Sequence, residues 1–193
     1  DVTYYDLNLR IDEQSKQIAG YVDIQFRAQH AFRRLQIDLY ENMRIDSIVF
    51  RQQVLDYERV EQAVFVDFPR VAPEEEGIFR VHYQGVPVTA PMAPWHGGFV
   101  WSRDGQNTPW VGVACEGDGA SLWWPNKDHL SDEPDSMAIN ITVRDPLVCI
   151  SNGNLRDKRR ADKGWTEYRW FVSYPINNYN VTVNIGDYVH FSD

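Results

Sequence analysis

The sequence predicts an all-β fold, a saddle-shaped antiparallel β-sandwich with long loops and little helix. Several short segments alternate apolar and polar residues with a period of two, which is typical of half-buried strands. The chain also carries seven Trp, ten Tyr and nine Phe, side chains that suit a pleated surface. No window of a dozen residues sustains the apolar stripe of an amphipathic helix. Together these observations favour strands throughout.

The first predicted element is a β-hairpin. Apolar residues alternate with polar ones over 5–11, and residues 12–16 form a polar turn. A second, longer run follows over 18–26, with Ile18, Tyr21, Ile24 and Phe26 as its apolar side chains. Gly20 lies inside this run and could mark a β-bulge. We expect the two runs to pair with each other.

Further strands are expected before and after an irregular middle. From Gly85 to Thr108 the alternation is lost among Pro and Gly residues, which predicts long connecting loops. Residues 120–124 could form a single helical turn. The other predicted strands are 35–39, 45–50, 64–68, 78–83, 137–143, 147–151, 165–172 and 181–185.

Length and charge bound the kind of protein. We expect residues 1–193 to form a single domain. The formal net charge of −9 disfavours nucleic acid or an anionic membrane as partner, because such binding needs clustered cations. The one basic run, Arg156–Arg160, is expected to be a solvated hairpin tip. No apolar stretch approaches the roughly 20 residues of a membrane span. The chain is expected to be soluble, either cytoplasmic or exported with its leader removed.

Two cysteines are too few for a disulfide scaffold. Cys115 and Cys149 are also far apart in sequence, so two unpaired and mostly buried thiols are expected. A bridge between them stays open, since it depends on whether their strands are neighbours.

The motifs of the common hydrolytic centres are missing from the sequence. None of the five histidines is followed by Glu, so the HExxH zinc helix is absent, and no GxSxG turn offers a serine nucleophile. The acidic runs 74–76 and 132–135 are expected to be solvated loops. We therefore expect no catalytic residue, no metal site and no cofactor in this chain.

One segment, 113–134, has an unusual composition for a connector. It combines small residues, carboxylates and two adjacent tryptophans in a turn-rich stretch. Binding and catalytic residues concentrate on such loops. The segment is thus the candidate functional region.

At these residues the chain resembles the N-terminal domain of zinc aminopeptidases of the aminopeptidase N and leukotriene hydrolase family. Val113–Gly117, Trp124–Asp128 and Met137–Val143 occur in the order of that family's motifs, and the opening Tyr4–Leu9 and closing Tyr174–Tyr179 are similar as well. The resemblance covers essentially the whole chain. It departs from the family pattern where Ala114 replaces Gln and Gly117 replaces Ala.

The resemblance implies a role in substrate binding. It makes Glu116 the residue that binds the α-amine of a peptide substrate, with Asp118 as a rival anchor. Trp123 and Trp124 could line the substrate approach or pack beside a domain interface. The zinc-binding HExxH helix and the third zinc ligand would lie beyond Asp193, in the catalytic domain of the same polypeptide. Zinc is thus implied for the parent enzyme, and the isolated domain is expected to be inactive.

A second class of function stays open. The chain could be a stand-alone β-sandwich module that binds carbohydrate or peptide through exposed aromatic side chains, without catalysis. An HExxH motif encoded past Asp193 would favour the aminopeptidase, and a stop codon there would favour the module.

Overall fold

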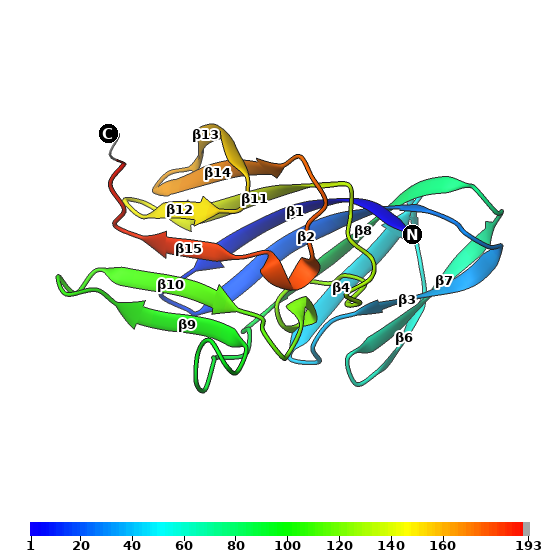
Figure 1. The fold of residues 1–193 in the computed structure, drawn as a ribbon, viewed down its shortest axis with the longest axis horizontal. Helices are drawn as coiled ribbons and strands as arrows, with labels where there is room; N and C mark the ends of the chain where they lie inside the picture. Colours follow the sequence, from blue (N-terminus) through cyan, green and yellow to red (C-terminus); the bar gives the residue numbers. More distant parts are fainter. Residues whose placement is uncertain (191–193) are drawn as a thin grey trace.

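The computed structural model describes residues 1–190 and confirms the all-β prediction. Three sheets make up the fold. The largest has eight strands in the order β13-β14-β11-β1-β2-β8-β4-β5, the second has the order β12-β15-β10-β9, and the third β3-β7-β6. In Figure 1 the four-stranded sheet lies toward one end of the molecule and the three-stranded sheet toward the other, both along the large sheet.

The strands and the two short 3₁₀ helices follow the chain in a simple order. Their bounds are β1 Val2–Asp12, β2 Gln17–Arg27, β3 Phe32–Asp38, β4 Met43–Phe50, β5 Gln53–Val54, β6 Tyr57–Val60, β7 Ala63–Val71, β8 Glu76–Gly85, β9 Gly98–Arg103, β10 Pro109–Ala114, η1 Ala120–Leu122, β11 Ser136–Arg144, β12 Val148–Ser151, β13 Asn154–Asp162, β14 Trp165–Val172, η2 Asn178–Asn180 and β15 Val183–Gly186. Each predicted strand overlaps one of these. None of the helices in the described part has the length and apolar character that crossing a membrane requires.

The predicted hairpin is confirmed, with one correction to its register. Strands β1 and β2 pair antiparallel, and the only register shift between them lies at Val2/Tyr4. Gly20 is therefore not a bulge. A Cβ there would lie 2.0 Å from the Asn8 carbonyl oxygen, so the position needs glycine for close backbone approach. Because the alternation is unbroken, Val22 is buried with Ile18, Ile24 and Phe26, whereas Tyr21 is only partly buried.

The large sheet also contains a pairing that the prediction of an antiparallel sandwich omitted. Strands β1 and β11 pair in parallel from Tyr4↔Ser136 to Arg10↔Thr142, whereas the other strand pairs of residues 1–190 are antiparallel. This pairing brings the end of the 113–134 segment against the N-terminal strand. The hydrogen bond from the Asp135 N–H to the Thr3 carbonyl (3.0 Å) marks the junction.

Two predictions about irregular regions were wrong. The stretch from Gly85 to Thr108 contains strand β9, which pairs with β10. The basic run Arg156–Arg160 is not a hairpin tip but the middle of β13, the exposed edge strand of the large sheet.

The core has two aromatic regions. Between the large and three-stranded sheets, five phenylalanines pack with ring centroids 5.2–6.2 Å apart: Phe26, Phe32, Phe50, Phe68 and Phe79. On the side of the four-stranded sheet, Phe99, Trp123, Trp124 and Tyr5 form a chain of edge contacts. The second region supports the candidate site.

Candidate functional site

The candidate site is built on a tight turn after β10. The Cys115 carbonyl accepts hydrogen bonds from the N–H groups of Asp118 (3.2 Å) and Gly119 (2.9 Å). Gly117 and Gly119 both have positive φ, 81° and 85°, which other residues adopt only with strain. The turn places Glu116 at its tip, where the side chain is exposed.

Asp128 fixes the next part of the segment. Its Oδ2 accepts a hydrogen bond from the Ser121 N–H (2.9 Å), at the start of η1. A Cβ on Gly119 would lie 2.2 Å from this oxygen, so the carboxylate occupies space that only glycine leaves free. The predicted helical turn is confirmed as η1, and it begins directly after Gly119.

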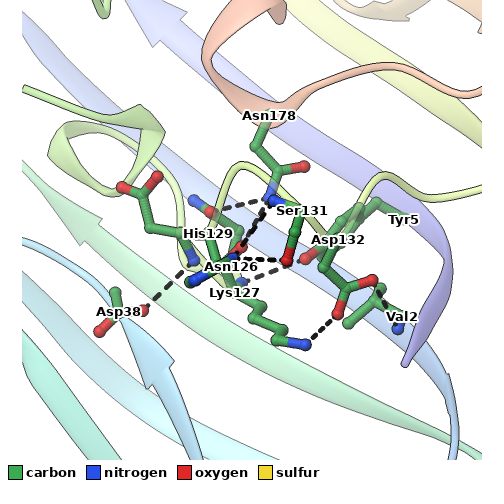
Figure 2. A network of polar contacts seen from close by, with 10 residues as sticks. Val2, Tyr5, Asp38, Asn126, Lys127, His129, Ser131, Asp132 and Asn178 are labelled. Carbon is green, nitrogen blue, oxygen red and sulfur yellow. Dashed lines mark hydrogen bonds and ion pairs between the residues drawn. The ribbon is translucent and has the colours of Figure 1, made fainter. Parts of the chain in front are cut away.

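A buried polar network, part of which is drawn in Figure 2, holds the segment to the rest of the fold. Asn126 and Asp38 exchange two backbone hydrogen bonds of 2.8 and 3.2 Å, which join the segment to the end of β3. The Asn178 amide donates to Asn126 Oδ1 (3.1 Å) and to the Lys127 carbonyl (2.8 Å). The Tyr5 hydroxyl accepts from the Lys127 N–H at 3.1 Å. Contacts from β1, β3 and η2 therefore converge on Asn126 and Lys127 and tie this part of the loop to the rest of the fold.

The two tryptophans of the segment do not reach its surface. Trp123 and Trp124 are each 0% exposed. Trp124 packs edge-on against Tyr5 at 4.9 Å, and Trp123 contacts Phe99 at 5.8 Å. A ring without exposed surface cannot touch a substrate in this conformation. In this structure both tryptophans pack in the core and do not line the cleft.

A cleft of about 810 Å³ opens beside the turn. It is lined by the 115–130 segment, by the end of β3 and by Tyr179. Four carboxylates lie along it: Asp38, Glu116, Asp118 and Asp128. Lys127 also lines it, and its ammonium forms an ion pair with Asp132. The cleft therefore has an excess of negative charge.

The four carboxylates differ in what they already bind. Asp118 accepts a hydrogen bond from the Gly97 N–H (2.5 Å), Asp128 accepts the one from Ser121, and Asp38 accepts one from the Asp128 N–H (3.3 Å). Within residues 1–190, the Glu116 carboxylate has neither a hydrogen-bond donor nor an ion-pair partner in the protein. It is thus the carboxylate of the cleft most available to a ligand.

Glu116 and Asp118 were identified from sequence, whereas Asp38 and Tyr179 were not. Asp38 enters the cleft through its pairing with Asn126, 88 positions later in the chain. Tyr179 is placed there by η2, through Asn178. No local sequence pattern signals either contact.

Neither cysteine is a candidate nucleophile. Cys115 and Cys149 are both free and buried, as expected for unpaired thiols. Burial raises the pKa of the Cys115 thiol to about 12. Burial also raises the pKa of Cys149. Both therefore remain protonated at neutral pH.

The histidines do not gather into a metal centre. Over the part of the chain that the structure describes, no group of three His, Cys, Asp or Glu side chains could hold a metal ion. Three of the four cleft carboxylates accept hydrogen bonds from backbone N–H groups, whereas Glu116 accepts none within residues 1–190. The excess of negative charge in the cleft would attract a cationic ligand.

These features define an all-β fold that presents carboxylates on a hydrogen-bonded loop. Residues 2–179 match the peptidase M1 N-terminal domain, and the chain belongs to this family. No curated protein matches the chain in sequence.

Solved structures share its fold. An M1 zinc metallopeptidase from Deinococcus radiodurans superposes with a TM-score of 0.80 at 22% identity, over 96% of this chain and 42% of that chain. A mutant form of that enzyme bound to a Tyr-Ser-Ala substrate gives a TM-score of 0.81, again at 22% identity with 96% and 42% coverage. Native leukotriene A4 hydrolase from Saccharomyces cerevisiae gives 0.73 at 17% identity, over 96% of this chain and 29% of that chain. The chain thus spans less than half the length of these proteins.

Proposed function

We propose that this chain is the N-terminal accessory domain of a zinc-dependent aminopeptidase that removes N-terminal residues from peptides. In this proposal residues 1–193 are one domain of a longer polypeptide and cover the active-site cleft of its catalytic domain. Membership of the M1 N-terminal domain family and the shared fold with M1 zinc metallopeptidases support it. A structural neighbour was crystallised with a tripeptide substrate, which favours peptides as the substrate class.

The observation that carries the proposal is the free carboxylate of Glu116. A substrate ammonium would form a charge-assisted hydrogen bond with it, shorter and stronger than a neutral one. Fixing the amine at this point would set the position of the first peptide bond relative to the catalytic groups, and so confine cleavage to the chain terminus. The hydrogen-bonded turn under Glu116 supports this role, because an anchor that is already positioned loses little entropy on binding.

The charge of the cleft supports the same ligand. Asp38, Asp118 and Asp128 line the same cleft as Glu116 and add negative charge to it, and Lys127 is held by Asp132. Such an arrangement attracts an ammonium group and repels a carboxylate. We therefore assign the amine end of the peptide, rather than its carboxyl end, to this cleft.

Zinc chemistry is not assigned to this chain. The described residues offer no ligand set for the metal, so we derive no step through it. The metal would be held by the catalytic domain of the parent. We propose that the isolated chain hydrolyses no peptide, because its sequence lacks the HExxH motif.

The proposal is tested by Glu116→Ala in the full-length protein. The loss of a charge-assisted hydrogen bond should cost about 2–4 kcal/mol in the transition state, so that kcat/KM for free-amine peptides falls about 30- to 1000-fold. Glu133→Ala removes an exposed carboxylate from the same segment and is the matched control. Unchanged kinetics in Glu116→Ala would move the anchor elsewhere, and a parent without peptidase activity would overturn the enzyme proposal.

No specific observation favours the stand-alone carbohydrate-binding module. Several aromatic faces on the large sheet are already covered by guanidinium groups: Arg80 lies 3.8 Å from the Tyr21 ring centroid, and Arg10 and Arg144 lie 4.6 and 4.5 Å from that of Trp165. These faces are less available for stacking on sugar rings.

A further inference from the structure

Strand β13 is one edge of the eight-stranded sheet and the longest strand whose residues are all exposed. Its nine residues, Asn154–Asp162, are all exposed, and it pairs on one side only, with β14. In Figure 1 it forms the outer margin of the sheet. The backbone N–H and C=O groups on its free side can pair with an added strand.

The edge carries an excess of positive charge in a chain whose net charge is −9. β13 contains four cationic residues and two carboxylates, a net charge of +2. Arg159 forms an ion pair with Glu167 on the neighbouring strand. Asp157 pairs with Arg169, and Asp162 pairs with Arg10. The charged residues of β13 that are left without an ion pair among residues 1–190 are therefore all cations.

Three cations of β13 have no carboxylate partner among residues 1–190: Arg156, Lys158 and Arg160. Lys158 and Arg160 stand opposite Tyr168 and Thr166, and so project from the same face of the sheet. Arg156 lies in the bulge between Leu155 and Asp157. The cross-strand ion pairs lie on the opposite face, through Asp157 and Arg159. One face of this edge is therefore electrically balanced and the other is not.

We propose that β13 is a docking site for an extended acidic polypeptide segment, which adds to the large sheet as a further strand. Main-chain pairing along the free edge would supply affinity, as in other cases of strand addition. Carboxylates at every second position of the segment would face Lys158 and Arg160 and set its register. This inference is independent of the proposed peptidase function.

A second copy of the chain fits this edge poorly. Pairing β13 with itself would place its uncompensated cations close to those of the other copy, and like charges on neighbouring strands destabilise a sheet. Charged side chains and β-bulges also protect sheet edges from unwanted pairing.

If protection were the only role of the cations and the bulge in β13, the strand would bind no acidic segment.

The test uses a nine-residue peptide of alternating Thr and Glu, labelled for fluorescence anisotropy and titrated at low ionic strength. We expect saturable binding that weakens as salt is raised. Lys158→Glu/Arg160→Glu should weaken binding at least tenfold. The control Arg33→Glu/Arg70→Glu makes the same change in net charge with exposed arginines of β3 and β7 that have no ion pair within residues 1–190, and it should leave binding unchanged. Circular dichroism and thermal melting would verify that both variants fold.

Two further probes separate strand addition from charge attraction. A peptide N-methylated at alternate residues cannot pair along the edge and should bind at least tenfold more weakly; equal binding would contradict strand addition. A Thr/Lys peptide should not bind. Three results would overturn the proposal. One is that the wild-type chain does not bind the Thr/Glu peptide at millimolar concentration, and another is that it binds a polyphosphate or nucleic acid more tightly. The third is a dimer of the chain that Lys158→Glu/Arg160→Glu dissociates.

Discussion

Replacing Gly119 by Ala should destabilise the fold, because two independent costs coincide there. Its φ of 85° and ψ of 166° lie in a region that is essentially glycine-only, at a cost of about 1–3 kcal/mol for alanine. The new Cβ would also lie 2.2 Å from Asp128 Oδ2. Moving this carboxylate breaks its hydrogen bond to Ser121, worth about 1.5–3 kcal/mol. The expected loss is about 3–5 kcal/mol.

Two other glycines separate these costs. Gly164 has a φ of 80° but nothing within 4 Å of its ideal Cβ, so Gly164→Ala should lose only about 1–2 kcal/mol. Gly105 has open space and no positive φ, so Gly105→Ala should stay within about 0.5 kcal/mol of wild type. Free energies of unfolding come from urea titrations followed by circular dichroism. A loss in Gly119→Ala no larger than in Gly164→Ala would refute the reasoning about Asp128.

Two further predictions concern the core beneath the site. Trp124→Ala should lower the free energy of unfolding by about 3–5 kcal/mol, because Trp124 is 0% exposed and packs against Tyr5; a loss under 1 kcal/mol in urea denaturation would contradict this burial. Since burial raises the pKa of Cys115 to about 12, its thiolate is scarce at pH 8. Neither Cys115 nor Cys149 should react with Ellman's reagent in the native chain, whereas both should react in urea. Rapid reaction of either thiol in the native chain would contradict its burial.

Much of the fold could be predicted because its strands obey local alternation. Where one face of a strand is buried, the period of two identifies the strand and its inner side, as in residues 5–11. The hairpin with β2 followed from the intervening polar turn. The possible bulge at Gly20 is not present, and the structure instead needs glycine there for close backbone approach.

Long-range pairings could not be predicted from local pattern. The parallel pairing of β1 with β11 joins residues about 130 positions apart, and nothing in either segment distinguishes it from an antiparallel neighbour. Strand β13 escaped prediction for a different reason. All its residues are exposed, so neither face of the strand has to be apolar. The sequence therefore shows no alternation of apolar and polar residues there.

The candidate site was predictable in part. Composition drew attention to 113–134, and the family resemblance singled out Glu116, whose role in binding the amine stays a prediction. The sequence could not decide whether Trp123 and Trp124 pack in the core or contact substrate, because aromatic side chains are suited to either role. In the structure both are buried, which favours packing. Asp38 joins the cleft only through tertiary pairing.

The most direct test of the central claim is a structure of the full-length protein with a bound peptide or amino-acid ligand. The account predicts that the ligand's α-ammonium nitrogen lies about 2.7–3.2 Å from a carboxylate oxygen of Glu116. A ligand whose amine is held by other residues, with the Glu116 side chain directed away from it, would contradict the account.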